Sequence, residues 1–498
     1  MKKVKDVVSN FLIYITIYST NFLFIMKIID ADIFFDLRSA KDILTYGLDF
    51  KDHMTMFTDL PYLYHHWLYD LIIYPIFNIG GYPLVLMFST TMFFIFSVLI
   101  YKTINKKINN RWLSLFITIV LANTMGKYFY PRVRMFNFII MVIIFNCINK
   151  LYETGKIKYS IIILISSIIM VNMHFPLWIL IPIFFLPYLV QMIIRLIKDK
   201  YNIKILEKKI NVVECNYKKV FIITFILVLL SCFISPFGIL PYTFPFRVMG
   251  EYNNVYIYID EMRRTVLLKK PVALVLFIIT LLTIIFKKNI KLSDLFYLIG
   301  LGILGLMSYR NLSYLYIFYT IIVSCILFED FKGIKLLDKI KNNKIIKKIN
   351  PVPIYIVFIG FNILLIGGII STLNFKEFKY GIDNGGEPVD LANYIVENMD
   401  YKNLKFFNDF ELGSYLAYRD IPIFVDGRVE VYMKEFNGRD DIIHYYYTDT
   451  PEEILNRYQF DYIITYEGKR MYKYLVENNY EEVYSDEYTY HMFKNKEV

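Results

Sequence analysis

Residues 30–70 read DADIFFDLRSAKDILTYGLDFKDHMTMFTDLPYLYHHWLYD and directly follow the first long apolar run of the chain. The stretch carries eight acidic residues and three of the six histidines, whereas the apolar segments that follow carry almost no acid. Ionisable side chains are costly inside a bilayer, so we expect this stretch to lie just outside one. The segments around it then decide the fold class.

The composition is that of a membrane protein with many spans. Of the 498 residues, 56% are hydrophobic, and the mean hydropathy is +0.42. A net charge of +10 would suggest nucleic acid as the partner of a soluble protein, but basic residues also collect in cytoplasmic loops of membrane proteins. We therefore expect a lipid bilayer and no nucleic acid as partner. The four cysteines lie in or next to apolar segments and indicate neither a disulfide framework nor a zinc site in the polar C-terminal part.

Segments of about 20 mostly apolar residues cross a bilayer as helices. The first apolar run is long and is followed by no small-residue cleavage site, so we interpret it as a retained span rather than a signal peptide. The sequence predicts a polytopic α-helical protein of about eleven spans. They lie near residues 9–29, 82–101, 112–130, 133–149, 159–173, 175–195, 219–236, 271–287, 292–308, 311–328 and 351–373.

The run 62–80, YLYHHWLYDLIIYPIFNIG, is apolar but contains two histidines, an aspartate and a proline, and it ends at a pair of glycines. We interpret it as a helix lying at the membrane interface. The loops 102–111, 196–218 and 329–350 are rich in lysine and arginine, which places them in the cytoplasm. The same charge pattern predicts a multi-pass cell-membrane protein with a cytoplasmic N-terminus and an extracytoplasmic C-terminal domain. A further span at 62–80 would put the basic loop 329–350 outside.

Residues 375–498 are charged, lack a long apolar run and alternate helix and strand patterns. The alternation predicts a small α/β domain with a mostly parallel sheet. We therefore expect two domains, a transmembrane domain at 1–374 with the outer loop 30–81, and the domain at 375–498. The expected strands are LKFFND, IPIFVDG, FDYIITY and a closing hairpin of EEVY and YTYHMFK, and the expected helices are LANYIVEN, ELGSYLAYR, PEEILNRY and RMYKYLVENN.

Asp30, Asp32 and Asp36 are the first candidates for chemistry. Acids at the outer end of a span can simply be solvated. A dense cluster followed by an amphipathic stretch also fits a carboxylate that acts as a general base toward a hydroxyl. The spacing of Asp30 and Asp32 fits oxygen ligation of a divalent cation such as Mg²⁺ or Mn²⁺.

Arginines near the predicted outer face are exceptions to the charge asymmetry. They can contact lipid phosphates by snorkelling, or converge on the phosphate of a lipid-linked substrate, because a guanidinium pairs phosphate through two bonds. His174 lies at an outer hairpin between two predicted spans, where it could bind substrate or have a structural role. The arginines are Arg132, Arg134, Arg247, Arg263, Arg264 and Arg310.

Two predicted strands of the C-terminal domain end in polar residues, Asn408-Asp409 and Asp426-Gly427-Arg428. Ligands of open α/β sheets bind outside the carboxyl ends of strands, which makes these residues candidates for binding. An Asp-Gly pair is equally typical of a plain turn.

The residues after the first span resemble the first outer loop of the GT-C glycosyltransferase superfamily, polytopic enzymes that take sugars from polyprenyl-phosphate carriers. The match aligns the stretch from Ala40 to Gly47 with the helical segment of that loop and extends from there toward the N-terminus. The resemblance places the catalytic aspartate at Asp32, with Asp30 beside it, and matches Asp52 to the acid that follows the glycine of the loop. It also likens the helix 62–80 to the juxtamembrane helix of those enzymes.

The chain is similar in more detail to a set of uncharacterised bacterial GT-C-like membrane proteins. It departs from their pattern in the HHWL motif, which lacks an acid, and in the start of the first loop, which lacks two tryptophans; both departures fit an altered substrate or lost catalysis. The shared motifs are DIFF at 32–35, HHWL at 65–68, NMH at 172–174, SPFG at 235–238, RN at 310–311 and FNDFELGSYLAYRDIPIFVDGRVEVY at 407–432.

With this resemblance, the sequence predicts a glycosyltransferase that moves a sugar from a polyprenyl-phosphate-linked donor to an extracytoplasmic glycan or protein acceptor. Asp32 would be the general base, and Asp30 would assist it or ligate the cation. The substrate-binding candidates are Arg132, Arg134, His174, Arg310 and Asp52.

Two other functions fit the sequence. One is a transporter or flippase of lipid-linked glycans, although coupled transporters usually place ionisable residues inside their spans and the acids here avoid them. The other is a non-catalytic membrane protein of envelope assembly that displays its C-terminal domain.

Overall fold

The computed structural model describes most of the chain, and the chain separates into two compact units. The helical unit comprises Met1–Ile28, Leu86–Pro241 and Ile259–Leu373, and the composite unit comprises Ile29–Val85, Tyr242–Tyr258 and Asn374–Val498. The described residues are 2–25, 30–201, 210–249, 255–328, 359–360, 362–364, 367, 386–486 and 490–496.

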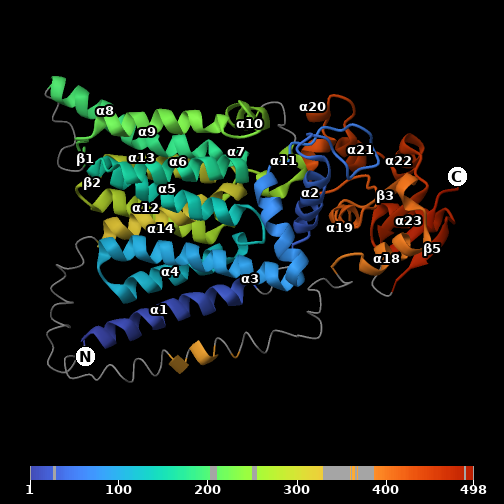
Figure 1. The fold of residues 1–498 in the computed structure, drawn as a ribbon, viewed down its shortest axis with the longest axis horizontal. Coiled ribbons are helices and arrows are strands. Elements are labelled where there is room, and N and C mark those ends of the chain that lie inside the picture. Colours follow the sequence, from blue (N-terminus) through green and yellow to red (C-terminus); the bar gives the residue numbers. More distant parts are fainter. Residues whose placement is uncertain are drawn as a thin grey trace. The chain divides into compact units, whose positions relative to one another are not determined.

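The helical unit is a bundle in which α5 packs on α6, α13 and α12 on α14, and α1 on α4 (Figure 1). The short strands β1 (Ile210–Asn211) and β2 (Ile290–Lys291) pair in parallel. The helices are α1 (Lys2–Ile25), the later part of α3 (Trp67–Ile108), α4 (Arg111–Met125), α5 (Arg134–Thr154), α6 (Ile157–Met173), α7 (Phe175–Trp178), α8 (Leu180–Tyr201), α9 (Lys218–Leu230), α12 (Pro271–Phe286), α13 (Leu292–Met307) and α14 (Leu312–Phe328), with the 3₁₀ turns η1 (Gly126–Tyr128), η2 (Ser231–Phe233), η3 (Asp260–Met262), η4 (Leu267–Lys269) and η5 (Tyr309–Asn311).

Local sequence sets the ends of these helices. The side chain of Asn110 accepts a hydrogen bond from the Leu113 amide at 3.2 Å and caps α4. Gly155 ends α5 with a φ of +60°, a left-handed conformation that glycine adopts without steric cost. Pro271 stands at the start of α12, where the amide that proline lacks would have had no partner.

Five helices of the described chain are long and apolar enough to cross a membrane. Three further apolar helices, α6, α12 and α13, are shorter. Described helices occupy the predicted span segments from 9–29 to 311–328, whereas 351–373 and the basic loop 329–350 lie almost entirely outside the described residues. The five candidates lie in Val7–Phe24, Trp67–Ile108, Arg134–Thr154, Phe175–Ile197 and Tyr309–Phe328.

The helix predicted at 62–80 begins later, at Trp67, and α3 breaks where the sequence places its glycine pair. Gly80 has φ −141° and Gly81 has φ +61°, so neither residue is helical. A positive φ strains residues that carry a Cβ, and glycine is the residue that permits it. The break separates the segment 67–79 from the apolar continuation of α3.

The composite unit joins segments from both ends of the chain. The segment 29–85, expected to belong to the transmembrane domain, packs here with residues from the C-terminal part. The described elements are α2 (Asp32–Tyr46), the first part of α3, α11 (Val255–Tyr258), α18 (Val389–Asn398), η8 (Tyr401–Asn403), β3 (Phe406–Asn408), α19 (Gly413–Tyr418), η9 (Val429–Tyr432), α20 (Lys434–Asn437), α21 (Ile442–Thr448), α22 (Pro451–Tyr458), β4 (Tyr462–Tyr466), α23 (Arg470–Glu477), β5 (Glu481–Ser485) and β6 (Tyr490–Lys494), and α10 (Leu240–Met249) crosses the boundary between the units.

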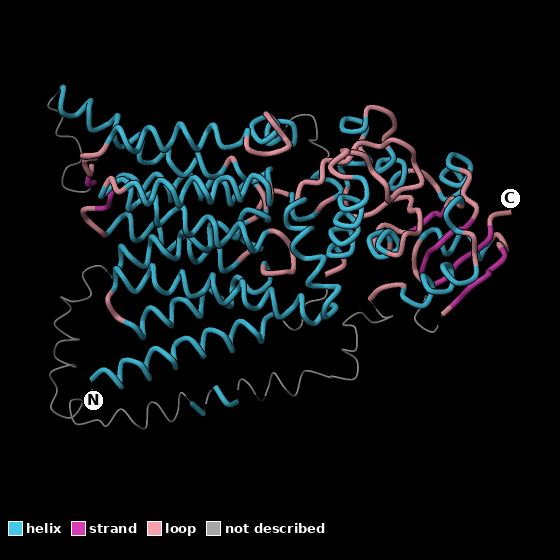
Figure 2. Tube along the Cα trace, in the orientation of Figure 1, coloured by secondary structure: helices cyan, strands magenta, loops and turns pink. Residues whose placement is uncertain are grey.

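The strands of this unit, magenta in Figure 2, form a four-stranded sheet in the order β3-β4-β6-β5. Only β3 and β4 are parallel; β6 is antiparallel to both β4 and β5. The prediction of a mostly parallel sheet is therefore wrong, because the closing hairpin inserts its second strand next to β4. The helices predicted at 391–398, 411–419, 451–458 and 470–479 are present as α18, α19, α22 and α23, with bounds that differ by at most two residues.

The predicted strand IPIFVDG is not a strand. Its Ile423 makes an isolated bridge to Thr55 in the segment 29–85. The side chain of Asn408 accepts from the Phe424 amide at 2.8 Å and donates to the Val425 carbonyl at 2.7 Å. One amide side chain thus takes the backbone hydrogen bonds that a neighbouring strand would make.

Helix α2 packs on α19. At the start of α19, Gly413 lets the helix approach the backbone of Val425 closely. The ring of Phe34 meets that of Tyr415 edge-on at 4.9 Å between centroids. A Cβ at position 413 would lie 2.0 Å from the carbonyl oxygen of Val425. A side chain at 413 would force the backbones apart.

We expect Gly413→Ala to lower the free energy of unfolding by about 1–3 kcal/mol or more through overpacking. Gly300→Ala is the control, because a Cβ at that position of α13 meets no atom within 4 Å. Thermal unfolding of the purified protein measures both variants. Equal melting temperatures for the two variants would contradict the close approach.

Candidate functional site

A buried group of charged residues in the composite unit is centred on Arg428, and we call it the Arg428 cluster. The Arg428 guanidinium contacts Oδ1 of Asp52 at 2.5 Å and Oδ2 of Asp426 at 2.8 Å. The side chains of Arg428 and Asp52 are 2% and 0% exposed. The hydroxyl of Tyr432 donates to Asp426 at 2.9 Å, and the ring of Tyr62 lies 4.7 Å from the guanidinium carbon.

The two carboxylates of the Arg428 cluster have opposite pKa shifts. Burial alone would raise the pKa of Asp52, but the charge of Arg428 and hydrogen bonds from Thr55 lower it below its ordinary value. Burial raises the pKa of Asp426, and the attraction of Arg428 does not compensate fully. One guanidinium neutralises two carboxylates, so the effect of burial on the pKa of Asp426 is only partly offset.

Asp52 was predicted to bind substrate, and its hydrogen-bonding capacity is used within the protein. Thr55 donates to Oδ2 of Asp52 from its hydroxyl at 2.6 Å and from its amide at 3.0 Å, while Arg428 holds Oδ1. The arrangement ties residues 52–55 to the VDGR motif. It indicates a structural role for Asp52.

Asp32 lies at the start of α2, against the same motif. Its Oδ1 is 3.4 Å from the position that a Cβ of residue 427 would take, so the absence of a side chain at Gly427 makes room for the carboxylate. Asp32 is partly exposed, whereas Asp30 and Asp36 are buried. Of the three acids, Asp32 is the most accessible to solvent.

Asp30 supports the beginning of α2. Its Oδ1 accepts a hydrogen bond from the Asp32 amide at 3.3 Å, and its own amide donates to the hydroxyl of Tyr82 at 2.9 Å. The cation site predicted at Asp30 and Asp32 stays a prediction. Within the described chain, the acids and histidine whose donor atoms converge are Asp36, His66 and Asp70.

The predicted phosphate-binding arginines lie in the helical unit, where Arg134 pairs with the carboxylate of Glu261 and the charges of Arg310 and Arg132 act on it. Arg134, the first residue of α5, is buried and contacts Glu261 at 2.9 Å. Burial alone would raise the pKa of Glu261, but Arg134, then Arg310 and Arg132, hold it below its ordinary value. We call these four residues the arginine cluster; it carries three positive charges and one negative charge.

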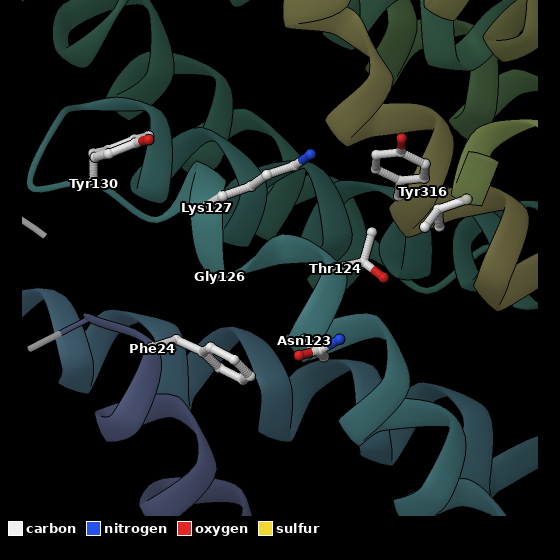
Figure 3. A pocket seen from close by; sticks show the side chains of 8 residues that line it. Phe24, Asn123, Thr124, Gly126, Lys127, Tyr130 and Tyr316 are labelled. Carbon is white, nitrogen blue, oxygen red and sulfur yellow. The ribbon is translucent and has the colours of Figure 1, made fainter. Parts of the chain in front are cut away.

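A cavity of about 420 Å³ lies in the same unit. Figure 3 shows the side chain of Lys127 extended toward Tyr316, with Phe24 of α1 on another wall. Tyr130 also lines the cavity, and its ring lies 5.5 Å from the guanidinium carbon of Arg132. Tyr130 thus connects the cavity to Arg132, and the cavity combines apolar walls with an ammonium group and hydroxyls.

His174 is buried at the end of α6, and its Nδ1 pairs with the side-chain nitrogen of Asn137 at 2.6 Å. Asn137 lies one turn after Arg134 on α5. This arrangement fits a structural histidine that fixes the turn between α6 and α7 and, through α5, the start of the arginine cluster.

Comparison with protein-family models found no match, and no curated protein is similar at a significant level. The resemblance to GT-C enzymes therefore stays a prediction based on the motifs.

Sequence reasoning singled out Asp52 and Arg428 separately and did not pair them, because 376 residues separate them. It also left Asp36 without a partner and assigned His66 only to an interfacial helix. A signal was present: Asp36 stands four residues after Asp32 on the same helical face, and His66 and Asp70 share the same i,i+4 spacing.

We expect Arg428→Gln to lower the free energy of unfolding by about 3–5 kcal/mol, because it leaves two buried carboxylates without a counter-charge. Arg428→Lys should recover only part of this loss, since an ammonium cannot serve both carboxylates with a planar fork. The control is Arg457→Gln, which removes an exposed pair with Asp449 and should cost no more than about 1 kcal/mol. Equal effects in thermal or denaturant unfolding would refute a central role for Arg428.

Asp409 provides a pH test. Burial raises the pKa of this carboxyl to about 6, although Thr465 and Tyr446 donate to it. The folded state therefore keeps a proton that the unfolded state releases between about pH 4 and 6, so this residue's contribution makes the fold more stable as pH falls through that range. We expect Asp409→Asn to flatten the change in melting temperature between pH 8 and pH 5. An unchanged pH profile in the variant would exclude Asp409 as its source.

Proposed function

We propose that the protein is a membrane glycosyltransferase that transfers a sugar from a polyprenyl-phosphate-linked donor to an extracytoplasmic acceptor. The observation that carries the proposal is the arginine cluster beside the amphipathic cavity. A lipid phosphate needs cationic groups for its head and apolar walls for its tail, and the helical unit has both. The motifs of the first outer loop supply the link to sugar transfer.

In this proposal Arg132, Arg134 and Arg310 bind the phosphate of the donor. Glu261 orients Arg134 by a hydrogen bond at 2.9 Å, and the three positive charges exceed its single negative charge. An arginine fork recognises phosphate with directed hydrogen bonds, and its charge stabilises the negative charge that develops on the leaving phosphate. The proposed role of Lys127 is to add a further positive charge at the cavity.

Asp32 is proposed as the general base that takes the proton of the acceptor hydroxyl as the new glycosidic bond forms. Its partial exposure and the space beside Gly427 support this choice over the buried Asp30 and Asp36. Asp30 is proposed to assist by holding the first turn of α2 through the Asp32 amide. The extracytoplasmic orientation follows from the charge asymmetry of the predicted loops.

A flippase for lipid-linked glycans is the second candidate, because the same cavity and arginines suit a lipid phosphate that is moved without being cleaved. The two functions differ in their need for a base. Transfer requires a group such as Asp32, whereas movement of the lipid requires only its recognition.

We expect Asp32→Asn to reduce sugar transfer from a polyprenyl-phosphate-sugar by about 100-fold or more, the range typical of a lost general base. Asp59→Asn is the matched control, since Asp59 is an exposed acid of the same loop that pairs only at the surface with Lys51. Transfer is measured with purified protein in liposomes and a labelled donor. Full activity of Asp32→Asn would overturn its role as base.

Arg134→Gln separates donor binding from the chemistry. We expect it to weaken binding of the polyprenyl-phosphate-sugar by about tenfold or more, as expected for a charged hydrogen bond worth about 1.5–3 kcal/mol.

A wild-type protein that moves the labelled lipid across the bilayer without cleaving it would replace the transferase by the flippase.

A further inference from the structure

A second pair of acids is buried in the composite unit, apart from the Arg428 cluster. Asp36 lies on α2 and Asp70 in the first turn of α3, and their residues are 2% and 1% exposed. His66, directly before α3, places its Nδ1 3.4 Å from Oδ1 of Asp36. One donor atom from each of the three residues lies within 4.8 Å of the other two.

No positive charge within the described chain acts on Asp70, in contrast to the carboxylates around Arg428. The charge that acts on Asp70 is that of Asp36, which has the same sign. Burying two carboxylates next to each other costs several kcal/mol per ion unless a counter-charge or a proton is present. In the Arg428 cluster a guanidinium supplies the counter-charge. At Asp70 the charge that acts within the described chain is that of Asp36, which repels it.

A second observation points to a ligand. Oδ1 of Asp70 is buried and has no hydrogen-bond partner among the described residues. Buried polar atoms are almost always paired, so such an oxygen requires an explanation. The alternative explanation is a proton shared by the two carboxyl groups, which are close enough to hydrogen-bond each other.

We propose that Asp36, His66 and Asp70 bind one divalent transition-metal ion. Two carboxylates and a neutral imidazole give a net charge of −2, which a divalent ion cancels. Carboxylate oxygens with an imidazole nitrogen suit Mn²⁺ or Zn²⁺ better than Ca²⁺, which prefers an all-oxygen shell. Metal–ligand bonds of about 2.0–2.2 Å put neighbouring donor atoms roughly 3–3.6 Å apart and opposite ones roughly 4.4 Å apart. The 3.4 Å between Nδ1 of His66 and Oδ1 of Asp36 already fits neighbouring ligands, and any pair near the limit of 4.8 Å has to come closer.

The site joins α2 to the start of α3, so the metal would fix the helix that carries Asp32 relative to the HHWL motif. Asp36 is one turn after Asp32 on α2. His66 is the most exposed of the three ligands, with 21% of its side chain accessible, and leaves a route for the ion and for water ligands. This inference concerns metal binding alone and does not depend on the proposed sugar transfer.

The test uses the purified full-length protein, treated with a chelator and then titrated separately with MnCl₂ and ZnCl₂. Bound metal is counted by elemental analysis, Mn²⁺ coordination is followed by electron paramagnetic resonance, and thermal unfolding is measured with and without metal. We expect one ion per chain and a rise in melting temperature on metal addition. Absence of stoichiometric binding in the wild type would overturn the proposal.

Two variants locate the ion. Asp70→Asn and His66→Gln should each weaken binding by more than about 100-fold, because losing even an outer-shell partner of a metal ligand costs 10–100-fold. Asp59→Asn, an exposed acid of the same loop, should bind as the wild type does. Metal binding that persists in both Asp70→Asn and His66→Gln would place the ion elsewhere and refute the site.

Metal-free Asp70→Asn gives an internal check on folding. Removing one of two repelling carboxylates should make this variant at least as stable as the metal-free wild type, and its melting temperature should not respond to the chelator. A wild type that is equally indifferent to the chelator would indicate a proton shared by Asp36 and Asp70 and would refute the metal.

Discussion

The composite unit depends on one guanidinium that neutralises carboxylates from distant parts of the chain. Arg428 pairs with Asp52 from the segment 29–85 and with Asp426 two residues before it. A buried ion pair of this kind adds little net stability over an apolar core, but removing one partner is costly, so it strongly selects the native pairing. The bridge of Ile423 to Thr55 and the packing of α2 on α19 join the same two parts of the chain.

The sequence predicts local structure in this protein better than it predicts long-range pairing. Apolar runs locate helices from the first segment to α14, and the glycine pair Gly80-Gly81 marks the break in α3, because both signals are local. The strand predicted at 421–427 fails for the opposite reason. Its apolar alternation is typical of a strand, but its backbone bonds to the Asn408 side chain and to Met54 and Met56, and no local pattern reveals these contacts.

The candidate site shows the same division. Arg132, Arg134 and Arg310 stand out in the sequence as exceptions to the charge asymmetry; in the structure Arg134 contacts Glu261, and the charges of the other two act on the same carboxylate. Asp52 was selected by motif position, yet it is used internally by Arg428 and Thr55. Asp36 was weighed as one acid among several, because its partners His66 and Asp70 come from the next helix and burial is not visible in a sequence.

The composite construction of this unit has a consequence for biosynthesis. Asp52 is made 376 residues before Arg428, which at about 5–20 residues per second is a delay of roughly 20–75 s. During that interval Asp52 lacks Arg428, so its carboxylate stays hydrated until the C-terminal part of the chain has been made. The ribosome must finish most of the chain before this loop can fold, and truncated products will be recognised by the loop that they leave exposed.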